Sequence, residues 1–178
     1  MPAMRALRRS GCPRFQRFAD WFADSEAERR AGATRVVAEV TGELVIAAGG
    51  QPFTLTARAD RIDITERGVL ITDYKTGTVP NDKQIASGMK PQLPLESAIA
   101  LGAPGFAGIA TGAAVIGLRY VRATGAEPPG EDRLVASAGV GALAEAALQN
   151  LMKLIARFDD VATPYKALRR GAFRLRLR

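Results

Sequence analysis

The spacing of apolar positions changes several times along the chain and divides it into a series of predicted elements. Between residues 13 and 30, aromatic side chains recur at helical spacing before a charged end, which predicts a helix. Residues 34–48 and 53–65 instead tend to alternate apolar and polar side chains on either side of the turn GGQP, a pattern typical of a β-hairpin. A further short apolar run at 69–77 follows the turn ERG and completes a predicted three-stranded meander.

Helical spacing returns after the meander, in residues 81–105, and stops at glycines and a proline. Residues 113–124 are typical of a fairly buried strand, and the segment EPPGED at 127–132 is interpreted as a loop. Alanine and leucine at 138–158 predict a long amphipathic helix. The expected order is therefore helix, three-stranded meander, helix, strand and C-terminal helix, which indicates an α/β fold class.

Composition limits both the number of domains and the available chemistry. A chain of 178 residues with 47% apolar composition is long enough for one core and too short to promise two. The absence of histidine removes the commonest general base, and the single cysteine, Cys12, excludes an internal disulfide or a metal site built from several cysteines. Any catalysis would therefore rest on carboxylates, lysine or hydroxyls. Neither a membrane-spanning run nor a signal peptide is recognisable, so we expect a cytoplasmic protein without membrane contact.

The formal net charge of +7 is concentrated near the end of the sequence. Residues 166–178 carry six basic side chains and no acid, so we separate this basic tail from a domain at 1–165. Such a tail is either simply solvated or bound to phosphates, and charge alone does not decide between them. The aromatic residues of the first helix pose a similar choice, and we favour core packing over a platform for stacked bases.

Two aspartates in the stretch RADRIDITERGVLITDYKTG are placed to meet. Asp60 lies late in the second predicted strand and Asp73 near the end of the third, and neighbouring antiparallel strands can present both side chains on one face. Lys75 follows Asp73 by two residues and shares its side, whereas Tyr74 points away and leaves its carbonyl near the site. Two carboxylates, a carbonyl and waters suit Mg²⁺, and a nearby ammonium would support metal-dependent phosphodiester hydrolysis.

A plainer interpretation is open for the same stretch. Asp60 or Asp63 could pair with Arg58 or Arg61 at exposed sheet positions. Asp73 could pair with Lys75 in the same way. A generic sheet-and-helix domain of this kind would bind no metal.

The motifs RADRID and DYKTG, with a step of thirteen residues from Asp60 to Asp73, resemble the RecB-type branch of the PD-(D/E)XK nuclease superfamily. The likeness extends over about residues 15–165 and is most specific to the nuclease domain of AddB-type subunits of bacterial helicase–nuclease complexes. It implies a restriction-endonuclease-like core. It also implies Asp60 and Asp73 as catalytic metal ligands, with the carbonyl of Tyr74 assisting, and Lys75 as the catalytic lysine.

The segment KPQLPLESAIA resembles the glutamine motif that follows the catalytic lysine in RecB-type nucleases, which implies Gln92 as a further catalytic residue. This sequence has Glu96 where that motif often has an aromatic residue. Two more departures are the missing histidine-bearing helical motif, so the domain at 1–165 is expected to lack its upstream helix, and the lack of cysteines for an iron–sulfur cluster. The acids Glu39 and Glu43 on the first strand are interpreted as solvent-facing.

The resemblance implies an exonuclease-type DNA nuclease that uses Mg²⁺, with Mn²⁺ as a substitute. Its partners would be DNA and an AddA-type subunit, in double-strand break repair by recombination. DNA would be bound mainly through sequence-independent phosphate contacts, for which the tail and Lys83, Lys90, Arg119 and Arg122 are candidates, although each of these charges taken alone is more typical of a solvated surface residue. The alternative is a nuclease-like module that no longer cleaves and serves as a DNA-binding or subunit-docking scaffold.

Overall fold

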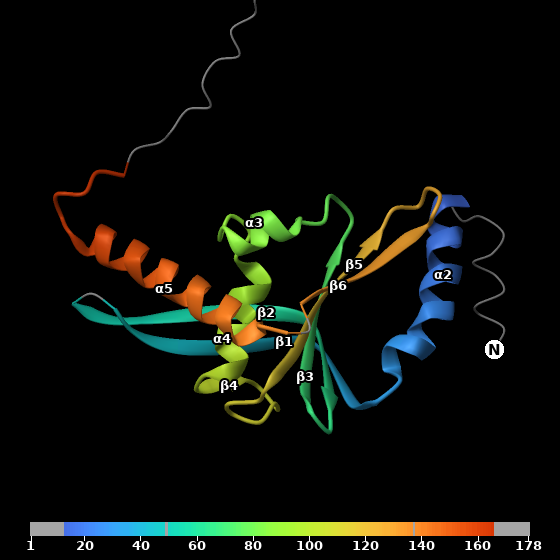
Figure 1. The fold of residues 1–178 in the computed structure, drawn as a ribbon, viewed down its shortest axis with the longest axis horizontal. Coiled ribbons are helices and arrows are strands. Elements are labelled where there is room, and N and C mark those ends of the chain that lie inside the picture. The colour runs from blue at the N-terminus through green and yellow to red at the C-terminus, as the bar shows by residue number, and fades with distance from the viewer. Residues whose placement is uncertain (1–12, 49, 137, 166–178) are drawn as a thin grey trace, which may run out of the picture.

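The computed structural model describes residues 13–48, 50–136 and 138–165, and Figure 1 shows their arrangement. The elements in chain order are α2 (Pro13–Arg30), β1 (Ala33–Ala48), β2 (Gln51–Thr65), β3 (Gly68–Lys75), α3 (Asp82–Ala86), α4 (Gln92–Leu101), β4 (Pro104–Phe106), β5 (Val115–Ala123), β6 (Gly130–Ala136) and α5 (Val140–Asp159). The basic tail at 166–178 and Cys12 lie outside the described residues. No helix in the described part has the length and hydrophobicity needed to cross a membrane.

The strands form one six-stranded sheet in the order β4-β1-β2-β3-β5-β6. The predicted meander is confirmed, because β1, β2 and β3 are consecutive and antiparallel, and β5 then pairs with β3 in parallel. Together with the helices this gives the α/β, restriction-endonuclease-like architecture that the sequence predicts.

Two features of the second half differ from the prediction. The helix expected at 81–105 is divided into α3 and α4, because Gly88 takes a left-handed conformation with φ +73° and Pro91 precedes the first residue of α4. The strands β4 and β6 were not predicted, and β6 begins inside the supposed loop at 127–132. Both are edge strands of the sheet, and edge strands are short and carry a weaker apolar pattern than central ones.

The main core lies between the sheet and α4. Ile62, Ile71 and Leu118 stand side by side on the three central strands and have no exposed surface. Leu93 and Ile99 of α4 are equally buried and belong to the same cluster. In Figure 1, α5 runs beside α4, while α2 stands at the other end of the sheet near β6. Because side chains alternate along a strand, the face that carries this core also carries Asp60 and Asp73.

Candidate active site

The two aspartates lie next to each other where β2 and β3 continue past their shared ladder. Arg61 stands opposite Thr72, so the next pair in the same register is Asp60 and Asp73. The Oδ2 atom of Asp60 accepts a hydrogen bond of 2.8 Å from the backbone N–H of Tyr74. The two carboxylates predicted from sequence therefore meet, and the backbone of β3 holds one of them in place.

Lys75 and Gln92 join Asp73 in a closed set of contacts. The Nζ atom of Lys75 lies 2.8 Å and 2.7 Å from the two carboxylate oxygens of Asp73, and it donates to Oε1 of Gln92 at 2.9 Å. The Nε2 atom of Gln92 donates to Oδ1 of Asp73 at 2.5 Å. Gln92 can make both contacts because it is the first residue of α4, and the start of that helix lies over the end of β3. The lysine is thus fixed by an acid on its own strand and by an amide from a helix.

Glu96 is a further side chain of the site that the sequence analysis did not assign. It lies one turn after Gln92 on α4, and its Oε1 accepts from Nε2 of Gln92 at 3.2 Å. Only 3% of Glu96 is exposed, and its Oε2 has no hydrogen-bond partner in the described part of the chain. The available signal was the spacing of four, which places both residues on one face of a helix. In the sequence, Glu96 stands out only as a departure from the family pattern.

Burial and like charge raise the pKa values in this cluster. Burial raises the pKa of Glu96 to about 7, with help from the nearby charges of Asp73 and Asp60, while the hydrogen bond from Gln92 opposes the shift. Burial also raises the pKa of Asp73, against the opposing effect of Lys75. We define the active-site cluster as Asp60, Asp73, Lys75, Gln92 and Glu96. It holds three carboxyl groups and one ammonium, so it lacks positive charge.

The donor set of this cluster fits a small hard cation. The carboxylates of Asp60 and Asp73 and the carbonyl of Tyr74 are the oxygen ligands that Mg²⁺ and Mn²⁺ accept, with waters completing the shell. Within the part of the chain that the structure describes, Oδ2 of Asp73 is buried and has no hydrogen bond, only its ionic contact with Lys75. No group of three or more acids, histidines or cysteines is assembled as a metal cluster in the described residues. Two carboxylates, one backbone carbonyl and solvent would therefore hold the metal.

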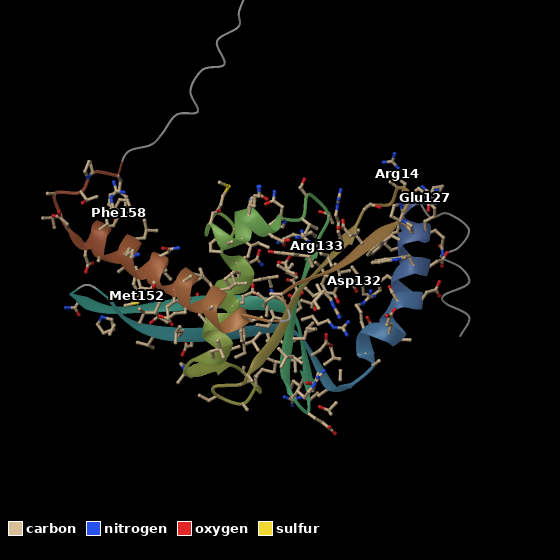
Figure 2. The ribbon with its side chains drawn as sticks, viewed as in Figure 1. Arg14, Glu127, Asp132, Arg133, Met152 and Phe158 are labelled. Carbon is tan, nitrogen blue, oxygen red and sulfur yellow. The ribbon has the colours of Figure 1, made fainter. Side chains whose placement is uncertain are left out.

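A second set of charges occupies the opposite face of β2 and β3. The guanidinium of Arg61 donates to both carboxylate oxygens of Glu26, at 2.8 Å and 2.9 Å, and to Oδ1 of Asp63 at 2.9 Å. Arg29 on α2 contacts Asp132 on β6 at 3.4 Å, and Figure 2 marks Asp132 on that strand. We define the α2 cluster as Glu26, Arg29, Arg61, Asp63, Arg119 and Asp132. Asp63 thus pairs with Arg61 as the ion-pair interpretation has it, but the pair is buried and not exposed, and it lies away from the active-site cluster.

The other charged candidates also take distinct positions. Arg58 pairs with Glu39 at 2.7 Å, and not with Asp60 or Asp63 as the ion-pair interpretation has it, and both side chains are exposed. Glu43 is exposed as expected.

The predicted phosphate contacts divide into two pairs. Arg119 and Arg122 form ion pairs with acids of β6, Asp132 at 3.2 Å and Glu131 at 3.6 Å. Lys83 on α3 and Lys90 between α3 and α4 are exposed.

Comparison with known proteins places this geometry in a family. The family described as the PD-(D/E)XK nuclease superfamily matches residues 3–174. An uncharacterized protein of Rickettsia bellii (strain RML369-C) and one of Rickettsia felis (strain ATCC VR-1525 / URRWXCal2) are each 40% identical over 77 residues. The match covers 43% of this chain and 9% of each relative, so the chain spans a small part of their length.

Among solved structures, the crystal structure of SSO0001 is similar with a TM-score of 0.37 and 16% identity, over 74% of this chain and 59% of that one. The family match extends over almost the whole sequence and includes every residue of the active-site cluster. The chain therefore belongs to the PD-(D/E)XK nuclease superfamily.

Proposed function

We propose that the chain is a metal-dependent DNA nuclease domain that hydrolyses phosphodiester bonds at the active-site cluster. The observation that supports this most strongly is the contact of Lys75 with both Asp73 and Gln92, next to Asp60. A domain that only needed ion pairs would have no reason to bury an excess of acid around one lysine, because uncompensated buried charge is costly. Membership of a nuclease superfamily supports the same conclusion.

Mg²⁺ or Mn²⁺ held by Asp60, Asp73 and the carbonyl of Tyr74 would supply Lewis-acid stabilisation of the phosphate and a more acidic water. The side chains of the chain itself then have separate tasks. The ammonium of Lys75 stabilises negative charge that develops on the phosphoryl oxygens and orients the attacking water. Gln92 holds that ammonium by accepting a hydrogen bond from it through Oε1.

Glu96 sets the orientation of the amide in this arrangement. The hydrogen bond at 3.2 Å to Oε1 of Glu96, together with the bond to Asp73, turns Nε2 of Gln92 away from Lys75, and Oε1 can accept even when the carboxyl is protonated on its other oxygen. The oxygen of the same amide is then left facing Lys75, where it can accept. Glu96 is thus a positioning residue for the lysine in the proposed reaction.

We further propose that the domain works in the cytoplasm as the exonuclease part of an AddB-type subunit, with an AddA-type subunit as partner, in double-strand break repair by recombination. The support is the sequence DYKTG around Asp73 and Lys75 and the glutamine motif at Gln92. The matched Rickettsia proteins are much longer than this region, so the chain would act as one part of a larger protein.

The test is cleavage of end-labelled linear DNA by the purified chain in Mg²⁺, in Mn²⁺ and in EDTA. We expect cleavage that requires the metal and falls by about 100-fold or more in Lys75→Ala and in Asp73→Ala. Lys153→Ala is the matched control, since it removes an exposed lysine of α5 that lies outside the cluster and outside the predicted phosphate contacts. Circular dichroism establishes that each variant is folded. A folded wild type that binds DNA but does not cut it would overturn the enzyme proposal in favour of a DNA-binding scaffold.

A further inference from the structure

An apolar pocket adjoins the active-site cluster at the end of β3. Its volume is about 310 Å³, and it lies between α2 and the ends of β3 and β5. Its lining consists of Phe18, Phe22, Tyr74, Lys75, Thr76, Val121 and Ala123. Aromatic rings and small aliphatic groups dominate this lining, and Lys75 is its only charged member. The pocket therefore offers flat apolar walls beside the ammonium that the proposed function assigns to catalysis.

The aromatic walls are held in fixed positions. The rings of Phe22 and Tyr74 lie 6.0 Å apart between centroids at an interplanar angle of 57°, and those of Phe18 and Phe22 lie 5.7 Å apart at 44°. The hydroxyl of Tyr74 accepts a hydrogen bond of 3.3 Å from Arg61, which the α2 cluster anchors. A preorganised surface of this kind binds a flat ligand without having to order its own side chains first.

Tyr74 connects the pocket to the catalytic face of the sheet. Its backbone N–H holds the carboxylate of Asp60 on that face, and its ring lines the pocket on the other. Lys75 follows directly and contacts Asp73. A nucleic-acid strand that places a phosphate at Lys75 would therefore bring a neighbouring nucleotide to the pocket.

We propose that this pocket binds an unpaired base of the DNA strand that is being cut. The proposal rests on the proposed function, since the phosphate at Lys75 is what carries the base to the pocket. Every base has a flat π-face that stacks on aromatic side chains whatever the sequence, and such stacking is typical of proteins that bind single strands. A base within a duplex is already stacked and paired, so the pocket would favour single-stranded or frayed ends over intact duplex. The aromatic residues of α2 would then serve partly as the stacking platform that the sequence analysis considered less favoured than core packing.

The experiment measures DNA binding in EDTA, so that no cleavage occurs and the result does not depend on catalysis. Fluorescence anisotropy compares a labelled thymidine oligonucleotide with one of equal length that has abasic sugars in place of its central nucleosides. We expect the wild type to bind the thymidine strand about 5- to 150-fold more tightly, the factor that corresponds to stacking one base. Tyr74→Leu should remove most of this preference and leave abasic DNA bound as before.

Phe15→Ala is the matched control, because Phe15 is an exposed aromatic residue of the same helix that does not line the pocket. Its preference for the base-bearing strand should equal that of the wild type. Phe18→Leu provides a second pocket variant should Tyr74→Leu unfold, and the fluorescence of 2-aminopurine reports stacking directly, since it should be quenched by the wild type and recover in the pocket variants.

Two results would overturn the proposal. One is a wild type that does not distinguish the two strands, and the other is a pocket variant that weakens the binding of both strands equally. In either case an apolar side chain of a protein partner would become the better occupant of the pocket. Cleavage of linear DNA that persists in these circumstances would leave the proposed nuclease function intact, so the two failures can be told apart.

Discussion

The active-site cluster and the α2 cluster lie on opposite faces of the same two strands, β2 and β3, and they balance charge differently. The α2 cluster pairs three acids with three arginines. The active-site cluster has three carboxyl groups and only Lys75 to compensate them. The sheet thus carries a charge-balanced cluster on one side and an acid-rich one on the other.

One glutamate from each cluster shows the consequence. Burial alone would raise the pKa of Glu26, but hydrogen bonds from Arg30, Arg61 and Arg29 outweigh it and lower the pKa to about 2. Glu96 has no arginine partner among the described residues, and burial raises its pKa to about 7. A cluster that satisfies its own charge can serve to hold α2 on the sheet. A cluster that does not is suited to a cation from solution, which is why we assign the chemistry to the second.

The largest effect on stability should come from removing an arginine of the α2 cluster. Arg61→Met leaves Glu26 and Asp63 without their shared partner in a buried position, and it should lower the free energy of unfolding by about 3–5 kcal/mol. Urea unfolding followed by circular dichroism measures this. Arg58→Met is the matched control on the same strand, because Arg58 forms an exposed pair with Glu39 and should cost less than about 1 kcal/mol. Equal losses in the two variants would mean that the α2 cluster is not what holds α2 in place.

A substitution in the active-site cluster should have the opposite effect on the protein, lowering its activity without lowering its stability. Asp60→Asn removes a carboxylate from the donor set of the proposed metal site, and the rate of DNA cleavage should fall by about 10²–10³-fold. The free energy of unfolding should stay the same or rise, because one of several like charges is gone. Glu43→Gln, at an exposed position of β1, should change neither quantity. A stability loss as large as that of Arg61→Met would contradict the division of tasks between the two faces.

The sequence predicts the acid-rich face better than the balanced one, and the reason is the range of the contacts. Asp73, Tyr74 and Lys75 are consecutive, so strand alternation alone indicates which side chains share a face. A short turn connects the strands that carry Asp60 and Asp73, so the sequence also indicates that these two strands pair. The contact of Arg61 with Glu26 joins residues 35 positions apart, in a helix and a strand. The periodicity of apolar residues within either segment gives no information about that contact.

The errors in the fold prediction also have local causes. The spacing of apolar residues continued across Gly88 and Pro91, so it could not indicate that α3 and α4 are separate helices. The edge strands β4 and β6 are short and only partly buried, which leaves too few positions for a recognisable alternation. The spacing between Gln92 and Glu96 indicates that the two side chains share a helix face. The burial of Glu96, however, is set by the packing of α4 on the sheet. Burial is the property that makes it chemically unusual.

The contrast between the two glutamates should be visible in the pH dependence of stability. The pKa of Glu96 is raised in the folded state from its ordinary value of 4.5 to about 7, so its stabilising contribution is complete below pH 4.5 and is lost as the pH rises through 7. The pKa of Glu26 is lowered to about 2, so its contribution is present above pH 4.5 and is lost as the pH falls toward 2.

Chemical denaturation at several pH values measures both effects. Between pH 5 and pH 8, Glu96→Gln should gain about 1–2 kcal/mol of stability relative to the wild type, because the wild type must ionise a buried carboxyl group and the variant does not. Glu26→Gln should be less stable than the wild type at pH 7, and the difference should shrink below pH 4.5. Parallel pH profiles for the two variants would contradict the assignment of opposite environments.

The smallest effect, and the most direct on the metal, is stabilisation by Mg²⁺. A ligand that binds only the folded state stabilises it. At a free Mg²⁺ concentration of ten times the dissociation constant, the free energy of unfolding should rise by about 1.4 kcal/mol, which corresponds to a rise in Tm of about 2–6 °C for a chain of this size. Differential scanning fluorimetry in Mg²⁺ and in EDTA measures the shift. Asp73→Asn should abolish it, since one of the two proposed carboxylate ligands is lost. Arg58→Met should keep the full shift, because its exposed pair lies outside the active-site cluster. A shift that survives in Asp73→Asn would place the cation elsewhere, and the excess of acid around Lys75 would then need another explanation.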